Sequence, residues 1–151
     1  MRSNSQLSRM LHVLIHMARH EGPVTSDLIA RMLNTNPVVV RRTMAGLRDR
    51  GYVTSGKGHG GGWELSRRLD EITLRDVHEA IGAPGLFAIG AAHDAPDCLV
   101  EQAVNSALDE TLREAEQGLL KRFGEITIQA LAQDFERRFA ERASPMFENP
   151  A

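Results

Sequence analysis

The break at residues 34–37, between two short amphipathic segments, constrains the fold of this chain more than any other feature. Before the break, Thr25 is placed to cap a helix of about eight residues whose apolar side chains recur at helical spacing. After it, Asn36 and Pro37 have the positions of an N-cap and a first-turn proline, and the helix they begin ends near Gly51. A turn this short forces the second helix to cross the first steeply, which predicts a helix-turn-helix.

The sequence around this pair predicts the remaining parts of a winged helix. Residues 5–20 form one amphipathic pattern, which predicts a first helix. After the helix-turn-helix, two short strand patterns at 52–55 and 63–65 flank the glycine-rich stretch 56–62. A hairpin in this position is the wing, and we expect Trp63 to anchor it on the core. A further helix, capped by Thr73, follows the wing.

The second half of the chain predicts one long helix. Residues 82–96 are rich in Gly, Ala, Pro and His and indicate a loop, after which Asp97 is expected to cap a helix over about 98–124. Such a helix is about 40 Å long, and its apolar stripe extends beyond a small domain. We therefore expect it to pair with its copy in a homodimer. A last helix begins near Thr127.

These patterns together define the expected fold class and domains. The fold class is mainly α: a winged helix-turn-helix domain with a two-stranded wing, plus a long C-terminal dimerisation helix. The expected division is a DNA-binding domain at 1–82, a connecting or sensor loop at 83–97, dimerisation helices at 98–143 and a flexible tail at 144–151.

The net charge of -2 conceals an uneven distribution of charge. Residues 1–69 hold eleven Lys and Arg against four Asp and Glu, a net charge of +7, and the remainder carries -9. A basic segment of this size is typical of a module that binds a polyanion, and the acidic remainder is expected to face away from it.

Three further features indicate a cytoplasmic protein without a membrane segment. No stretch approaches the roughly 20 apolar residues that span a bilayer. The first residues are polar, unlike a signal peptide. The chain has a single cysteine, which suits a reducing compartment.

The third helix and the wing are the predicted DNA-reading elements. Helical geometry turns Val40, Met44 and Leu47 toward the core and leaves the opposite face, with Arg42 at its centre, for a major groove. We expect Arg42 to contact a guanine edge. Apolar contacts, for example with a thymine methyl group, are assigned to Val38, Val39 and Ala45, and phosphate contacts to Arg41 and Arg48. A plain solvated face is the alternative for this helix.

In the wing, Lys57 supplies charge, glycines allow the backbone to approach phosphates, and His59 is placed to enter a minor groove. The candidate DNA-binding residues are Asn36, Val38, Val39, Arg41, Arg42, Ala45, Arg48, Lys57, His59 and Gly60.

Two other function classes fit the sequence less well. A cysteine hydrolase built from Cys98 and His93 lacks an orienting group, and its acidic neighbours disfavour a thiolate, so we expect no enzyme. A winged helix that binds protein rather than DNA would need neither the basic half nor a charged recognition face.

The stretch from Val24 to Val77 resembles the Rrf2-type winged-helix transcriptional regulators, which include the iron-sulfur cluster regulator and the nitrite-sensitive repressor. The resemblance is carried by Ile-Ala in the second helix, Asn36-Pro37, the Leu-Arg-x-x-Gly-x-Val exit of the third helix, the Gly-Gly-Gly-Trp-Glu-Leu wing and Ile-Thr-Leu-x-Asp-Val before the fourth helix. It implies a homodimer that binds a partly palindromic operator in double-stranded DNA and represses by blocking RNA polymerase.

The chain departs from this family pattern at the sensor. Cluster-binding relatives carry three cysteines in the loop before the long helix, whereas this chain has Cys98 alone. Because iron-sulfur clusters favour thiolates over ligands such as His93, Asp94 or Asp97, we expect no [2Fe-2S] cluster and no other cofactor.

Cys98 has two open interpretations. In one, oxidation of the thiol or its bridging to another thiol shifts the dimer and releases DNA, so that the regulator responds to redox state. In the other, Cys98 is a small buried hydrophobe.

Three histidines in the first helix, His12, His16 and His20, have a spacing that can bind zinc. Since Glu21 is the one carboxylate near them, a solvated or dimer-contacting stripe is favoured and no metal site is expected.

Overall fold

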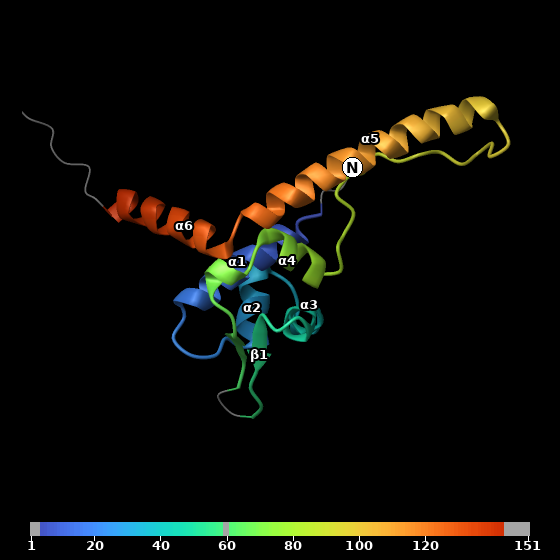
Figure 1. Cartoon of the computed structure of the whole chain (residues 1–151). Coiled ribbons are helices and arrows are strands. Elements are labelled where there is room, and N and C mark those ends of the chain that lie inside the picture. The colour runs from blue at the N-terminus through green and yellow to red at the C-terminus, as the bar shows by residue number, and fades with distance from the viewer. Residues whose placement is uncertain (1–3, 59–60, 144–151) are drawn as a thin grey trace, which may run out of the picture.

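Helices make up most of the computed structural model, which describes residues 4–58 and 61–143 (Figure 1). The wing lies on one side of the helical body, and the two C-terminal helices leave the opposite side (Figure 1). In chain order the elements are α1 (Gln6–Arg19), α2 (Ser26–Leu33), α3 (Pro37–Asp49), β1 (Val53–Ser55), β2 (Trp63–Leu65), the 3-10 helix η1 (Leu69–Glu71), α4 (Leu74–Ala80), α5 (Leu99–Glu125) and α6 (Ile128–Ala143).

Side-chain caps fix the helix-turn-helix. The Thr25 hydroxyl accepts a hydrogen bond from the backbone N–H of Leu28 at 3.2 Å and begins α2. Asn34 ends that helix in the left-handed conformation, with φ of 51°. Two residues later the Asn36 side chain accepts from the N–H of Val39 at 3.0 Å, and a proline occupies the first turn of α3. The predicted helix-turn-helix is therefore confirmed.

The core lies where α1, α2, α3 and the base of the wing meet. Fully buried side chains from each helix fill it, among them Leu14, Ile29 and Met44. At the contact between α3 and α4 the backbones come so close that a Cβ atom on Gly46 would lie 2.1 Å from the carbonyl oxygen of Ala80. Glycine at position 46 is thus a packing requirement, because any side chain there would push the two helices apart.

The wing is a short antiparallel hairpin that is fixed to the start of α2. β1 pairs with β2, with Ser55 opposite Trp63. Trp63 is buried, and its indole Nε1 donates to the Ser26 hydroxyl at 2.9 Å. Its backbone N–H and carbonyl also pair with Val24 at 2.8 and 2.9 Å. The expectation that Trp63 anchors the hairpin is confirmed, and the anchor sets the position of the wing relative to the helix-turn-helix.

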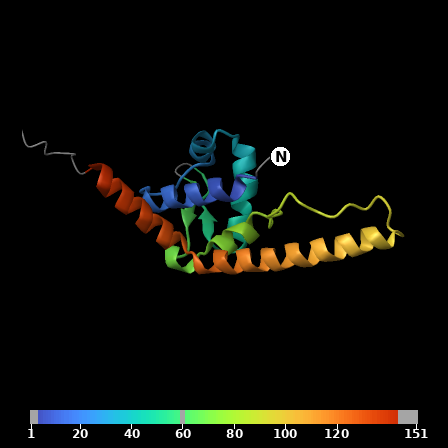
Figure 2. The same cartoon turned by 90° about the horizontal axis from the view of Figure 1, so that it is seen from above.

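The long helix α5 projects beyond the body, and the preceding loop runs outward beside it to the far end, where the helix begins (Figure 2). None of the side chains of α5 is buried within this chain. The helix begins one residue later than predicted: Cys98, rather than Asp97, is its N-cap. The Glu101 carboxylate accepts a hydrogen bond from the N–H of Ala95 at 2.9 Å. This bond ties the loop to the first turn of the helix at Ala95, two residues before the predicted cap Asp97.

The start of α6 returns to the winged-helix core. The N–H of Leu74 donates to the carbonyl of Ile126 at 2.9 Å, and the N–H of Ile128 donates to the carbonyl of Ile72 at 2.8 Å. Ile128 itself is fully buried in the core. Further along, Arg19 of α1 pairs with Glu136 of α6. Backbone hydrogen bonds therefore join residues 126–128, between α5 and α6, to residues 72–74, just before α4. The sequence did not predict this connection.

Candidate nucleic-acid interface

The outer face of α3 has the exposure that the sequence predicted. Val40, Met44 and Leu47 are buried against the other helices. Val38 is 60% exposed, and Val39 is also exposed. Among the remaining candidates on this helix, Arg41, Arg42 and Arg48 are exposed and Ala45 is half-buried.

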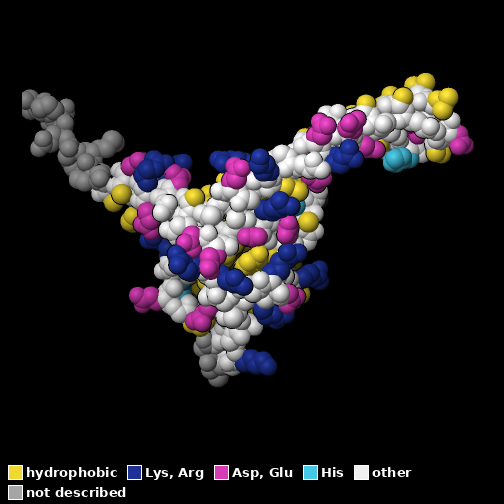
Figure 3. Space-filling model, viewed as in Figure 1, with side chains coloured by type: hydrophobic (Ala, Val, Ile, Leu, Met, Phe, Trp, Pro, Cys, Tyr) yellow, Lys and Arg dark blue, Asp and Glu magenta, His cyan; other side chains and the backbone are white. Residues whose placement is uncertain are grey.

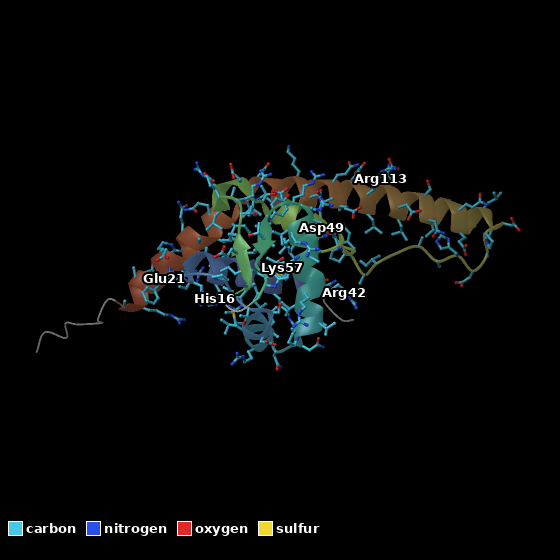
Figure 4. The ribbon with its side chains drawn as sticks, turned by 90° about the horizontal axis from the view of Figure 1, so that it is seen from below. His16, Glu21, Arg42, Asp49, Lys57 and Arg113 are labelled. Atoms are coloured by element: carbon cyan, nitrogen blue, oxygen red, sulfur yellow. The ribbon has the colours of Figure 1, made fainter. Side chains whose placement is uncertain are left out.

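Arg41 and Arg42 are free of internal partners within the part of the chain that the structure describes. Other arginines differ: the Arg50 guanidinium lies 3.3 Å from the Glu79 carboxylate, and Arg68 lies 2.6 Å from the Asp70 carboxylate. Figure 4 shows Arg42 on the outer side of α3. An unpaired guanidinium can take a phosphate or a guanine edge without first breaking an ion pair.

The other polar candidates at the two ends of α3 are partly engaged. Arg48 approaches the neighbouring Asp49 carboxylate at 3.3 Å, an exposed pair of little strength. Because the Asn36 side-chain oxygen already accepts from the N–H of Val39, its amide NH₂ group is the part left to contact a base or a phosphate.

The backbone conformation of the wing requires glycine at two of its positions, Gly58 and Gly61. Gly58 has φ of +83°, in the region that favours glycine. A Cβ atom on Gly61 would lie 2.8 Å from the carbonyl oxygen of Gly56. Lys57 is exposed on this hairpin (Figure 4), whereas the candidates His59 and Gly60 lie outside the described residues.

A hollow of about 280 Å³ lies between the wing and the helix-turn-helix, lined by Thr25, Asp27, Arg41 and Ser55 among others. The start of α2 thus lies next to the two elements that were predicted to read DNA. The N-terminal cap motif at Thr25 was the available sequence signal, but its position beside Arg41 depends on the packed fold.

Arg9 of α1 is a second feature that sequence reasoning missed. It lines a hollow of about 300 Å³ together with Val39 and Thr43 of α3, so a cation from the first helix extends the face formed by α3. In the sequence Arg9 stands out only as a member of the polar side of the first helix.

Acidic side chains lie along the projecting helix, and the body below it carries basic side chains with acidic ones among them (Figure 3). Like charge repels phosphate, so the acidic helix favours DNA on the opposite side, where α3 and the wing lie.

Cys98 is exposed at the start of α5, so no other part of this chain buries it as the hydrophobe interpretation expects. The backbone amides of Glu101 and Val100 lower the pKa of the thiol, because N–H groups in the first helical turn stabilise a thiolate. The acidic neighbours noted in the sequence therefore do not determine the direction of this pKa shift.

Two of the three histidines singled out in the sequence are paired with each other in α1. Nε2 of His12 and Nε2 of His16 are 2.8 Å apart, whereas His20 turns to the carbonyl of Gly22. Burial, His12 and Arg19 lower the pKa of His16. Among the described residues no three side chains of His, Cys, Asp or Glu are grouped to hold a metal ion.

Comparison with known proteins gives consistent matches. The Rrf2 family model, described as an iron-dependent transcriptional regulator, matches residues 3–134. YwnA of Bacillus subtilis, named as an HTH-type transcriptional regulator, is 34% identical over 119 residues, which cover 77% of this chain and 86% of YwnA.

Solved structures show the same fold. A transcriptional regulator from Lactobacillus plantarum matches with a TM-score of 0.72 and 21% identity over 93% of this chain and 99% of its own. IscR of T. potens matches with a TM-score of 0.65 and 19% identity over 98% of this chain and 94% of its own.

In the described residues no helix combines the length and apolar character needed to cross a membrane.

The donor set does not fit the iron named in the family description. The chain has one cysteine, which is too few thiolates for an iron-sulfur cluster. Its neighbours His93, Asp94 and Asp97 do not form a ligand group with it among the described residues. The residues described in this chain therefore do not fit an iron-sulfur cluster.

Proposed function

The chain belongs to the Rrf2 family of transcriptional regulators, which are DNA-binding proteins and not enzymes, and from this premise we propose that it is a homodimeric repressor of a partly palindromic operator. The observation that carries the proposal is the exposed face of α3, where Arg41 and Arg42 have no internal partner among the described residues. Arg41 also lines the hollow beside the wing, which presents Lys57. In this proposal α3 enters the major groove and the wing contacts the adjacent backbone.

The free part of α5 supports the dimer. Val100 is 71% exposed and Val104 is 52% exposed. Both belong to the first turns of α5, and this end of the helix extends beyond the body (Figure 2). Leu99 is exposed beside them. A helix that leaves several large apolar side chains in water is stabilised when a partner covers them, and a second copy of the same helix supplies a self-complementary surface.

Repression and its control are parts of the same proposal. A dimer bound across an operator excludes RNA polymerase from an overlapping promoter. We further propose that Cys98 makes the regulator responsive to oxidants. Its thiol is exposed and has a lowered pKa, and it lies at the start of the helix that forms the proposed dimer contact.

Selection of bound fragments from random duplexes, repeated at several salt concentrations, tests the proposal. We expect an enriched inverted repeat, binding that weakens steeply with salt, and a mass of two chains by light scattering. Enrichment of no sequence, with weak salt dependence, would instead favour a winged helix that binds protein.

The redox component has its own test. Operator binding is measured before and after peroxide for the wild type and for Cys98→Ser. Loss of binding in the wild type alone supports the thiol sensor, and an equal response of both proteins contradicts it.

A further inference from the structure

A cavity of about 680 Å³ lies between the winged-helix body and the long helix. Its walls come from the start of α1, from α4, from the segment 84–88 and from the C-terminal half of α5. This volume falls within the range of roughly 300–1,000 Å³ that is typical of small-molecule sites. The cavity is distinct from the α3 and wing surface and from the exposed part of α5.

The walls favour an uncharged ligand that contains a ring. The large side chains in the walls are apolar, among them Leu7, Phe87, Leu119 and Phe123. No Lys, Arg, Asp or Glu occurs among the described residues that line the cavity. A charged group would lose its hydration there without gaining a partner, whereas an aromatic ring would pack against Phe123 and its neighbours.

One wall also carries an acceptor for a hydrogen bond. His78 is 4% exposed, and its Nε2 lies 2.8 Å from the carbonyl oxygen of Pro84. Since a carbonyl can only accept, Nε2 is a donor in this contact, and Nδ1 is an acceptor when the ring is neutral. That Nδ1 has no hydrogen-bond partner among the described residues. Because Nδ1 is itself buried, the acceptor on this wall is the Pro84 carbonyl, which lines the cavity and keeps a second lone pair for a ligand that donates an N–H or O–H.

We propose that this cavity binds a small, uncharged aromatic molecule that carries one hydrogen-bond donor. The His78 and Phe123 rings, which meet edge to face with centroids 6.3 Å apart, would be part of the contact surface. A ligand in this position touches α4 and α5 at once and therefore favours one arrangement of the body relative to the long helix.

The consequence for DNA rests on the proposed function. α4 packs on α3 at Gly46 and Ala80, while α5 would set the distance between the two α3 helices of a dimer. A ligand that changes the contact between α4 and α5 would therefore change operator affinity.

Calorimetric titration of the full-length protein with indole tests the site itself. We expect indole to bind, 1-methylindole to bind about fivefold more weakly because it lacks the donor, and indole-3-carboxylate not to bind. Ala88→Trp should abolish indole binding, because Ala88 is an exposed residue that lines the cavity and the larger side chain would fill it. Ala130→Trp, a matched change at an exposed position of α6, should leave binding unchanged.

The outcomes separate the site from its regulatory effect. Absence of indole binding up to its solubility limit, or equal binding by Ala88→Trp and Ala130→Trp, overturns the proposed site. If indole binds as expected but leaves the operator dissociation constant unchanged, the regulatory part is wrong and the site remains. Failure of the protein to bind any duplex would contradict the proposed function, and the titrations would still decide the cavity.

Discussion

At the scale of single residues, the two adjacent arginines of α3 should make separable contributions to DNA binding. Neighbouring helical positions are about 100° apart, so Arg41 and Arg42 cannot both be directed at the same point in a groove. Arg42 lies nearer the centre of the exposed face, and Arg41 lines the hollow beside the wing. We therefore assign base reading to Arg42 and phosphate contact to Arg41.

Arg42→Ala should relax the preference for one base pair in each half-site by about 1–3 kcal/mol, because a bidentate contact to guanine is lost. Arg41→Ala is the matched control and should weaken specific and random duplexes alike. Competition binding with single-base operator variants measures both effects. Equal losses on specific and random DNA for Arg42→Ala would refute its assignment.

The wing cation should contribute through charge alone. Lys57→Ala is expected to weaken binding to all duplexes and to reduce the slope of log affinity against log salt by about one ion. Lys121→Ala, an exposed lysine on the long helix, should leave the slope unchanged. A salt titration of each variant provides the measurement, and an unaltered slope for Lys57→Ala would remove the wing from the proposed interface.

Substitution of Gly46 should destabilise the fold strongly, although the sequence around this glycine gives no sign of it. A methyl group there collides with the backbone of Ala80, so Gly46→Ala should lower the free energy of unfolding by about 1–3 kcal/mol or more. Gly118→Ala, in a helix with open space around the new atom, should raise it by roughly 0.5–1 kcal/mol. Urea unfolding compares the pair, and equal shifts would contradict the close contact between α3 and α4.

At the scale of elements, the first turn of α5 determines the chemistry of Cys98. Backbone N–H groups lower the pKa of its thiol, so the reactive thiolate should form at a lower pH than in an ordinary cysteine. The rate of iodoacetamide alkylation against pH should therefore have its midpoint below that of the same protein unfolded in urea. Coincident midpoints would show that the helix start does not stabilise the thiolate.

The helix-turn-helix and the wing were predictable because local rules determine them. The cap motifs at Thr25, Asn36 and Thr73 lie next to the helices they begin, so their effect is visible in a short window of sequence. The sequence could not predict contacts between distant segments. Ile128 was expected on the apolar face of a last helix, but its burial in the core depends on backbone pairing with Ile72, which is far away in the sequence.

Exposure along α3 was predictable for the same reason, since helical periodicity alone separates Val40 from Arg42. The ion-pair partners of a charged side chain were not predictable from the sequence. Nothing local indicates that Arg50 meets Glu79 while Arg42 stays free among the described residues, because pairing depends on how α3 lies against α4. The cap of α5 failed as a prediction because the Glu101 carboxylate binds the preceding loop at Ala95.

At the scale of the whole molecule, the exposed apolar part of α5 and the face of α3 that contacts DNA depend on each other in the proposed dimer. The wing and α5 extend from opposite sides of the body (Figure 1). If the α5 helices of two subunits pair, both wings and both α3 helices therefore stay free to contact one duplex. Binding two half-sites at once raises the affinity far above that of one subunit, since the second contact is intramolecular.

Val104→Glu tests this dependence directly. A carboxylate in a dry helix–helix contact loses its hydration without a partner, so the variant should dissociate into monomers. Its helix content should stay unchanged, because Val104 is 52% exposed in the single chain. Operator affinity should fall by a factor of about 100 or more, to the level of one half-site. Light scattering and operator titration on the same samples give both quantities.

Gln117→Glu is the matched control for Val104→Glu, since it adds the same charge to an exposed position of the same helix about 220° around its axis. That variant should remain dimeric and bind the operator like the wild type. If Val104→Glu also remains dimeric, the exposed apolar part of α5 is not the dimer contact. If it becomes monomeric but keeps full operator affinity, each subunit reads DNA alone and the inverted repeat has no role in binding.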